Sequence, residues 1–375
     1  MSKLIFNFAS KRIKNIKDAK NLLGGKGFNL SEMGRMGLPV PPGFTISTKV
    51  CDLFYKNNKK LNHKITSIIK EELRKIEKES SKKFGDLENP LLVSVRSGAR
   101  VSMPGMMDTI LNLGLNDKTV IALAKKTSNP RFAKDSYRRF IQMYSNVVMG
   151  VKSYNFEELI ENYKLTKGVL LDTDLDENDW DDLIQDFKSV IKKNTNKDFP
   201  QNVYEQLFGA ISAVFLSWES KRAKVYRKLN QIPSNWGTAV NVQSMVFGNM
   251  GNDCATGVVF TRSPSDGTND IYGEYLVNAQ GEDVVAGTRT PQYISKKSCK
   301  DILAEKKSME KLMPKTFKQL KKILNTLEKH YRDMQDVEFT VENNKLWMLQ
   351  TRSGKRTAKS AVKIAVDMVK EKLIS

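Results

Sequence analysis

The sequence predicts a mixed α/β protein of two or three compact units. Its 375 residues exceed the roughly 100 to 200 residues of one typical domain. Helical periodicity dominates residues 116–235, whereas apolar runs typical of strands dominate from Thr238 onward. Hydrophobic residues make up 40% of the chain and charged residues 28%, as in ordinary soluble globular proteins. We therefore expect a helical segment between stretches that carry strands.

Secondary structure follows a clear order along the chain. Residues 1–115 combine glycine-rich turns with a lysine-rich helical stretch and an apolar strand, Leu91–Val95. The tail at 358–373 has apolar residues at helical spacing, and this face leads us to expect that the natural chain continues. Further helices are expected at 119–126, 135–149, 180–193 and 203–229, and strands in TAVNVQSMVFG, TGVVFTRSP, YGEYLVNA and VEFTVENNKLWMLQTR.

Charge and composition argue against several classes of function. The formal net charge is +20, but the lysines are spread along helical stretches and no cluster of arginines with aromatic residues is present, so we expect no nucleic-acid partner. No apolar run approaches the roughly 18 residues of a membrane span. Cys51, Cys254 and Cys299 are odd in number and far apart, as expected for reduced thiols. We therefore expect a cytoplasmic protein without a membrane partner.

Three aspartates, Asp172, Asp174 and Asp176, have the spacing of the first ligands of a calcium-binding loop. Glu177 stands where such a loop needs glycine, and Leu183 stands where it needs a bidentate glutamate. We interpret the acids as the first turn of a helix, where the helix dipole stabilises carboxylates.

One predicted hairpin, at 336–352, carries its polar residues on one face. In both arms, apolar residues fall at odd numbers and polar residues at even numbers. The apolar residues can therefore share one face of the hairpin only if the two residue numbers in each cross-strand pair add up to an even number. A three-residue loop at 342–344 meets this condition, whereas a two-residue turn at 343–344 does not. The polar face would then hold Asp336, Glu338, Gln350 and Arg352.

This polar face has two interpretations. Carboxylates beside an amide oxygen suit Mg²⁺, which takes few protein ligands and several phosphate or water oxygens. A surface patch of ion pairs explains the hairpin equally well when it is taken alone.

Three glycine-containing motifs suggest a phosphate site. In GGKG (24–27), backbone N–H groups and Lys26 could surround an anion at a helix start, although a structural turn is at least as good an explanation and the Walker pattern is absent. RSGARVSMPGMMD (96–108) offers two arginines, Arg96 and Arg100, that can clamp phosphates. FGNMGNDCATGVVFTRSP (247–264) could form a lid over phosphates or a plain hairpin.

Five long motifs occur together: LLGGKGFNLSEMGRMGLPVPPGF, PLLVSVRSGARVSMPGMMDTILNLGLND, NPRFAKDSYRRFIQMYSNVVMG, GEYLVNAQGEDVVAGTRTP and MQDVEFTVENNKLWMLQTRSGKRTA. In this order they resemble the N-terminal nucleotide-binding domain of the pyruvate phosphate dikinase family. The resemblance covers almost the whole chain, from Leu22 to Ala358. The related pyruvate, water dikinases share GGKG and an arginine-containing loop, but SMPGMMDTILNLGLN is typical of the phosphate-using enzymes.

The resemblance implies an ATP-grasp fold, in which two α/β lobes close on a nucleotide. Residues 1–115 with 200–243 would form the first lobe, 116–199 a helical insert, 244–352 the second lobe, and 353–375 the start of a linker to a phosphohistidine domain. The family converts ATP, phosphate and pyruvate to AMP, pyrophosphate and phosphoenolpyruvate, with a histidine on a swivelling domain as carrier. A pyruvate, water dikinase-type domain and a non-catalytic nucleotide sensor are the alternatives.

The resemblance also implies a role for each matching residue. Lys26, Arg96 and Arg100 would bind phosphates. Asp336, Glu338 and Gln350 would hold Mg²⁺ and orient the transferring group, with Glu338 and Gln350 as metal ligands. Further nucleotide contacts would come from Gly25, Gln243, Met245, Val246, Thr256 and Gly257, and, near the nucleoside, from Glu282, Asp283 and Arg352.

The sequence departs from the family pattern in the third glycine-containing motif. The family usually has Ser-Gly-Thr-Gly where this chain has Cys254-Ala255-Thr256-Gly257, and the missing glycine predicts a less flexible lid. Neither His63 nor His330 has the Thr-Ser-His context of the family's acceptor histidine. We therefore expect the phosphohistidine and pyruvate-binding domains to be partners outside this chain, which alone would bind ATP with negligible turnover.

Overall fold

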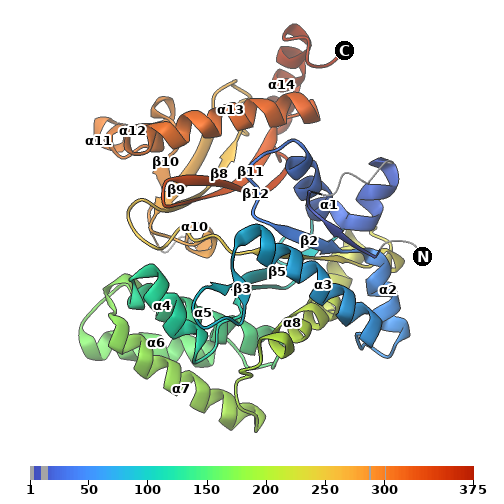
Figure 1. Cartoon of the computed structure of the whole chain (residues 1–375). Coiled ribbons are helices and arrows are strands. Elements are labelled where there is room, and N and C mark those ends of the chain that lie inside the picture. Colours follow the sequence, from blue (N-terminus) through green and yellow to red (C-terminus); the bar gives the residue numbers. More distant parts are fainter. Residues whose placement is uncertain (1–3, 10–15, 287–288, 300) are drawn as a thin grey trace. The chain divides into compact units, whose positions relative to one another are not determined.

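The computed structural model describes residues 4–9, 16–286, 289–299 and 301–375. The chain divides into two compact units: unit 1 comprises Met1–Ser31 with Pro42–Met245, and unit 2 comprises Glu32–Pro41 with Val246–Ser375. Each unit contains a five-stranded sheet and several helices (Figure 1). The mixed α/β class expected from the sequence is confirmed, while the boundaries expected for lobes, insert and linker stay a prediction.

The sheet of unit 1 brings together strands that are distant in sequence. Its order is β1-β2-β7-β5-β6, and all neighbours are antiparallel. Every residue of the central strand β7 is buried, including the polar residues Asn241 and Gln243 that alternate with its apolar ones. The strands are β1 (Ile5–Asn7), β2 (Gly43–Ile46), β7 (Ala239–Ser244), β5 (Val93–Gly98) and β6 (Thr109–Leu113), with a separate parallel pair of β3 (Lys83–Phe84) and β4 (Pro90–Leu91).

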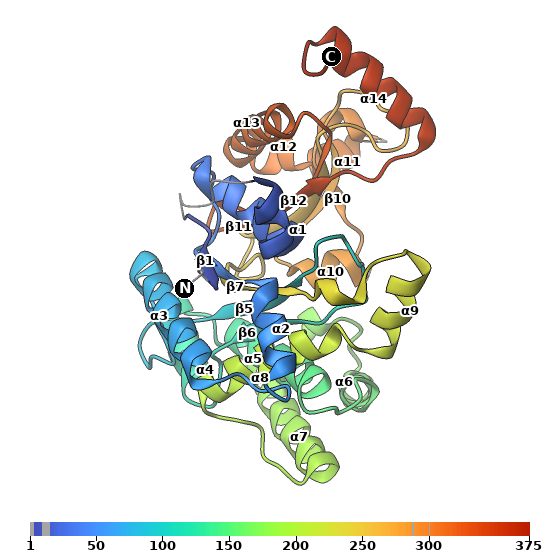
Figure 2. The ribbon, with the colours of Figure 1, turned by 90° about the vertical axis from the view of Figure 1, so that its right-hand side faces the viewer.

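The helices of unit 1 include a group in which α5 packs against α4 and α7 (Figure 2). Three of the helices predicted for this region are confirmed within a few residues, while α6 was not predicted. The helices are α1 (Ile16–Arg35), α2 (Thr48–Lys56), α3 (His63–Ser80), α4 (Thr119–Thr127), α5 (Pro130–Val147), α6 (Tyr154–Lys167), α7 (Glu177–Thr195), α8 (Val203–Ser217) and α9 (Lys221–Leu229), with 3-10 turns η1 (Asp172–Asp174) and η2 (Ser234–Trp236).

The single long helix expected at 203–229 is wrong, because the chain forms two helices there. Helix α8 ends at Ser217, and Ser220 begins α9 as its N-cap, with its side chain accepting a hydrogen bond from the Ala223 amide. A serine that satisfies a free N–H group favours a new helix start over continuation.

The acidic run before α7 has the structural role expected from the sequence. Asp176 is the N-cap of α7, and its carboxylate accepts hydrogen bonds from the amides of Asn178 and Asp179. These backbone hydrogen bonds hold the pKa of Asp176 below its usual value. Within the described ranges, no three His, Cys, Asp or Glu residues are grouped as metal ligands.

The sheet of unit 2 is also antiparallel, in the order β10-β9-β8-β11-β12, and helix α13 packs against β11 and β12. The strands are β10 (Gln292–Tyr293), β9 (Tyr272–Val277), β8 (Ala255–Phe260), β11 (Gln335–Glu342) and β12 (Lys345–Ser353). The helices are α10 (Gly281–Ala286), α11 (Ile302–Lys306), α12 (Met309–Leu312), α13 (Pro314–Tyr331) and α14 (Ala358–Lys370), with a 3-10 turn η3 (Lys296–Ser298).

The predicted loop of the β11–β12 hairpin is wrong. Glu342 pairs with Lys345, so the turn has two residues, Asn343 and Asn344, with φ of 50° and 61°. A β-bulge shifts the register between Glu338 and Phe339. Between the bulge and the start of β11, the numbers of paired residues therefore again add up to an even number, as the prediction required. Beyond the bulge the core residues of β12 are therefore Leu346 and Met348, in place of the expected Trp347 and Leu349.

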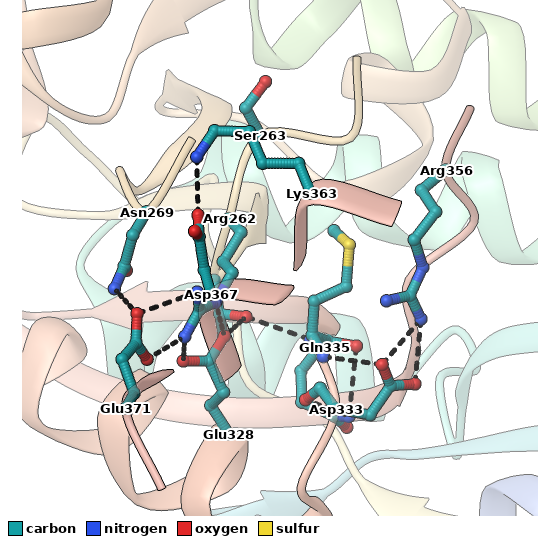
Figure 3. Close-up of polar contacts among 12 residues, drawn as sticks. Arg262, Ser263, Asn269, Glu328, Asp333, Gln335, Arg356, Lys363, Asp367 and Glu371 are labelled. Carbon is teal, nitrogen blue, oxygen red and sulfur yellow. Dashed lines mark hydrogen bonds and ion pairs between the residues drawn. The ribbon is translucent and has the colours of Figure 1, made fainter. Parts of the chain in front are cut away.

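Helix α14 is fastened to unit 2 at both ends. Near its start the Ser360 hydroxyl donates to Ser263 O at 3.0 Å, and just after its end Glu371 accepts hydrogen bonds from the buried guanidinium of Arg262 (Figure 3). Apolar side chains of α14, Ile364 and Met368, pack with Met334. Residues after the sheet therefore belong to the packed structure of unit 2.

Among the described helices, none combines the length and the apolar character that crossing a membrane requires.

Candidate functional site

The glycine turn of unit 1 lies against the arginine-containing loop. Gly24 interrupts α1 with φ 67° and ψ 173°, and the adjacent Gly25 amide donates to Ala99 O at 2.9 Å. A Cβ atom on Gly24 would overlap the carbonyl of Gly98, so only glycine permits this approach. The motifs that carry Lys26 and Arg100 are thus brought together, as a shared phosphate site requires.

Arg96 is held inside the sheet of unit 1 by Gln243. Arg96 lies on β5 and is 9% exposed, while Gln243 lies on β7 and is 1% exposed. The Arg96 Nη2 donates to Gln243 Oε1 at 2.6 Å. The sequence suggested that Gln243 belongs to an adenine-contacting strand, but no pattern within either motif indicated this contact between side chains.

Arg100 rests on an aromatic ring. Its guanidinium carbon lies 5.2 Å from the centre of the Trp236 ring, a cation–π arrangement. Burial lowers the pKa of Arg100, and its Nε is buried without a hydrogen-bond partner among the described residues. A buried donor without a partner is the feature that an anionic ligand satisfies.

The end of β7 carries the next two predicted contact residues. Ser244 is the last residue of the strand, and the Met245 amide donates to Leu92 O at 2.8 Å. Val246 is the first residue of the second, longer segment of unit 2. The boundary between the units therefore falls inside the strand that was predicted in TAVNVQSMVFG.

The polar face predicted for the hairpin of unit 2 is confirmed. Asp336 pairs with Arg352 and Glu338 pairs with Gln350 in the β11–β12 register. The Arg352 Nε donates to Asp336 Oδ2 at 2.7 Å, and the Gln350 Nε2 donates to Glu338 Oε1 at 2.8 Å. Two carboxylates, an amide and a guanidinium are therefore in contact on one face.

Asp336 is the most perturbed group of this face. It is 5% exposed, and burial raises its pKa although the hydrogen bond and charge of Arg352 oppose the shift. Its Oδ1 is buried without a hydrogen-bond partner among the described residues. An orphaned carboxylate oxygen beside Glu338 fits a hard cation such as Mg²⁺, which needs few protein ligands.

The β8 residues predicted to contact nucleotide have different surroundings. Thr256 lies on the same face as Asp336 and Glu338, and its hydroxyl hydrogen-bonds with Phe339 O and the Thr340 hydroxyl. Gly257 lies on the opposite face, where a Cβ atom would come within 2.7 Å of the Phe339 ring. Packing against Phe339 is thus a sufficient reason for glycine at this position.

The expected lid at 247–264 is only partly a loop. Strand β8 begins at Ala255, which pairs with Val277 and Val341, so the Cys254-Ala255 departure falls at the start of a strand. The Cys254 thiol accepts a hydrogen bond from the Asn343 amide, and burial raises its pKa to about 11. The missing glycine therefore lies outside the loop, at a position whose backbone needs no glycine.

The two acids expected near the nucleoside lie in the first turn of α10. The Asp283 carboxylate accepts a hydrogen bond from the Gln280 amide at 2.9 Å, and Glu282 is half-buried beside it. The amide and the carbonyl of the Gln280 side chain are both buried without partners among the described residues.

Comparison with known proteins shows the family to which the chain belongs. The sequence matches the family described as pyruvate phosphate dikinase, AMP/ATP-binding domain, over residues 20–82, 59–314 and 295–373. A Rhizobium meliloti (strain 1021) protein named pyruvate, phosphate dikinase is 54% identical over 375 residues, 100% of this chain and 42% of the relative. A Clostridium symbiosum protein of the same name is 56% identical over 357 residues, 95% of this chain and 40% of the relative. Similarity also extends to the Flaveria pringlei protein named pyruvate, phosphate dikinase, chloroplastic, at 54% identity over 372 residues, 99% of this chain and 38% of the relative.

A glycine turn packed on an arginine loop, a polar sheet face and a match along the chain define a nucleotide-binding domain of the kind that handles AMP and ATP. The chain belongs to the pyruvate phosphate dikinase AMP/ATP-binding domain family. It spans about two fifths of the length of the curated relatives that it matches.

Proposed function

We propose that this chain is the ATP-grasp part of a pyruvate phosphate dikinase. In this proposal its two units are the two lobes that grip ATP, and a histidine on a domain outside the chain receives the phosphoryl group. The overall reaction would convert ATP, phosphate and pyruvate to AMP, pyrophosphate and phosphoenolpyruvate. The family membership and the names of the relatives support the phosphate-using reaction over the pyruvate, water dikinase alternative.

The observation that carries the proposal is the pairing of Asp336 with Arg352 and of Glu338 with Gln350 on one face of the hairpin. Asp336, Glu338 and the amide oxygen of Gln350 are the oxygen ligands that would hold Mg²⁺, after Gln350 turns its amide over. Mg²⁺ would supply charge neutralisation on the phosphate oxygens. The Gln350 Nε2 atom donates to Glu338 Oε1, and the amide of glutamine can present either of its two polar atoms at this place after such a turn.

The unit 1 residues would act on the phosphates. Lys26, Arg96 and Arg100 supply positive charge, and the Gly25 amide, which donates to Ala99 O just after β5, joins the motif of Lys26 to that of the two arginines. Phosphoryl transfer gains rate chiefly from positioning and charge stabilisation, so fixed cations of this kind are the expected protein contribution. We also propose that Gly25, Met245, Val246, Thr256, Gly257, Glu282, Asp283 and Arg352 contribute nucleotide contacts, as the resemblance implies.

The test is a calorimetric titration of ATP into the wild type and into Glu338→Ala, with and without Mg²⁺. Glu338→Ala is expected to lose the part of the affinity that depends on Mg²⁺ and to keep the metal-independent part. Asp367→Ala, which removes a partly exposed carboxylate paired with Lys363 on α14, is the matched control and should bind ATP as wild type does. Wild-type protein that does not bind ATP, or a Glu338→Ala variant that keeps the full Mg²⁺ dependence, would refute the proposal.

A second measurement separates a catalytic domain from a nucleotide sensor. ATP labelled in its β-phosphate is mixed with the chain and a separately supplied carrier domain of a relative. The proposal expects label on the carrier only when the chain is present, and a sensor would bind ATP without labelling the carrier.

A further inference from the structure

Helix α1 is shared by the two units. Its end, from Glu32 onward, belongs to unit 2, whereas the residues of α1 before Glu32 belong to unit 1. Lys26 lies on the unit 1 side of this boundary, six residues before Glu32. The backbone of α1 leaves the helical conformation at Gly24, which precedes both residues, and is helical from there to its end. At about 1.5 Å of rise per residue, one helical rod of about 9 Å therefore joins Lys26 to Glu32.

Two contacts hold the end of α1 and the segment after it in unit 2. Glu32 is 6% exposed, and its Oε2 lies 3.1 Å from Nε2 of His330, near the end of α13. An ionised carboxylate has only acceptors, so Nε2 carries the hydrogen of this bond. Farther along the segment, the Met348 amide of β12 donates to Pro39 O at 2.7 Å. The chain that follows Lys26 is thus attached to a helix and to a strand of unit 2.

The carboxylate of Glu32 has a further partner on its own helix. Arg35, one turn later, forms an ion pair with Glu32 Oε1. One carboxylate oxygen therefore meets α1 itself, and the other meets α13. Of these two pairs, the pair with His330 is the one that joins α1 to another element.

We propose that Glu32, held by His330, is a positioning residue that fixes the helix of Lys26 to unit 2, the unit that carries the proposed Mg²⁺ ligands. This inference rests on the proposed function. Lys26 and the ion would then meet the same polyphosphate from one rigid frame, and groups that are held in place before binding lose less entropy when the ligand arrives. It follows that the gain in ATP affinity from Mg²⁺ depends on the contact between Glu32 and His330.

The test is a calorimetric titration of ATP into wild type, His330→Ala and His330→Gln, each with and without Mg²⁺. His330→Ala removes the donor and should reduce the gain from Mg²⁺ about fivefold or more, a usual size for coupling between two sites. Its affinity for ATP without Mg²⁺ should stay within about twofold of wild type. His330→Gln keeps a side-chain N–H donor and should restore most of the gain. A merely structural role would weaken ATP binding alike with and without Mg²⁺.

His63→Ala is the matched control, because His63 is the other histidine of the chain and is exposed at the start of α3. It should leave both affinities within about twofold of wild type. Thermal unfolding of each variant checks that it is folded. His330→Phe, which keeps a ring but has no donor, carries the test if His330→Ala does not fold.

The outcomes are separable. A His330→Ala variant that keeps the full gain from Mg²⁺, or that loses affinity equally with and without Mg²⁺, would overturn the inference, while wild-type binding of ATP with Mg²⁺ upholds the proposed function. Failure of the wild type to bind ATP would overturn the proposed function itself.

Discussion

The buried guanidinium of Arg262 donates two parallel hydrogen bonds to the carboxylate of Glu328, from Nε to Oε1 and from Nη2 to Oε2, both at 2.9 Å. Arg262 is fully buried and Glu328 is 8% exposed. The same guanidinium reaches Glu371 Oε2 at 2.5 Å, so one cation joins the residues after β8, helix α13 and the segment after α14 (Figure 3). Forked arginine–carboxylate pairs are directional as well as strong, so this contact fixes where α14 leaves the sheet.

Replacing Arg262 by methionine should strongly destabilise unit 2. The change leaves Glu328 buried without its cation, and breaking a buried ion pair from one side costs about 3 to 5 kcal/mol. Urea-induced unfolding, followed by hydrogen exchange of α13 and β8, measures the loss in the free energy of unfolding.

Lys363→Met is the matched control, because Lys363 pairs with Asp367 on the surface of α14. Exposed pairs contribute about 0 to 1 kcal/mol, so this variant should stay close to wild type. The double variant Arg262→Met with Glu328→Met should recover part of the loss, since no buried charge remains. An equal loss in Lys363→Met, or no loss in Arg262→Met, would contradict this account.

Acid should loosen α14 through Glu371. The hydrogen bond from Arg262 lowers the pKa of Glu371 in the folded protein, so its contribution to stability is present above the ordinary glutamate pKa and is lost as the pH falls through the lowered value. The protection of residues 358–373 against hydrogen exchange, after correction for the intrinsic pH dependence of exchange, should therefore stay constant down to about pH 4, near the unfolded glutamate pKa, and should fall at lower pH.

Glu371→Gln removes the titrating group but keeps an acceptor for Arg262 and Asn269. Exchange in this variant should be faster than wild type near neutral pH and should change less with acid. Identical acid dependence in the two proteins would show that another group controls the release.

The ring of Trp236 should contribute to nucleotide affinity through Arg100. Cation–π contacts contribute about 0.5 to 2 kcal/mol, so Trp236→Leu should weaken ATP binding about twofold to thirtyfold, whereas Trp236→Phe, which keeps an aromatic face, should lose less. Calorimetric titration with ATP measures both.

A second aromatic ring provides the control for this change. The Lys152 ammonium lies 5.9 Å from the centre of the Tyr154 ring, and Tyr154 is exposed at the start of α6. Tyr154→Leu should therefore leave ATP affinity within about twofold of wild type. Equal losses from the two aromatic residues would argue against a specific role for Trp236.

Local alternation in the sequence was sufficient to predict the polar face of the β11–β12 hairpin, but not its turn. Side chains alternate along any strand, so Asp336 and Glu338 share a face in every register that the partner strand β12 could adopt. The register of β12 depends also on the bulge at Leu349, and nothing in an apolar leucine marks it as the extra residue. The prediction therefore placed Trp347 in the core, where the structure has Leu346 and Met348.

The contacts that the sequence could not predict join distant segments. Arg96 and Gln243 are 147 positions apart, and their meeting depends on β5 lying next to β7. The role of Arg262 depends likewise on two helices that follow it in the chain. Sequence pattern ranks residues by type and neighbourhood, but only the order of strands in the sheet decides which of them touch.

Ala255→Gly, which restores the glycine usual in the family, should lower stability and leave nucleotide binding unchanged. Ala255 is fully buried in β8, opposite Val277 and Val341, with no left-handed backbone conformation that glycine would relieve. Glycine within a strand costs about 0.5 to 1 kcal/mol relative to alanine, chiefly in backbone entropy. Denaturant unfolding should show this loss, and calorimetry should give an ATP affinity within about twofold of wild type.

Gly251→Ala makes the converse change in the loop that precedes β8. A Cβ atom there would meet only Asp253 Oδ1, at 3.4 Å, so stability should change by less than about 0.5 kcal/mol. If this loop closes over phosphates, which is one of the two interpretations of its sequence, stiffening it should slow ATP association in stopped-flow measurements, whereas Ala255→Gly should not. A slower association in Ala255→Gly with an unchanged rate in Gly251→Ala would instead indicate that β8 is the moving segment. That result would contradict this account, because β8 is paired on both sides, by β9 and by β11.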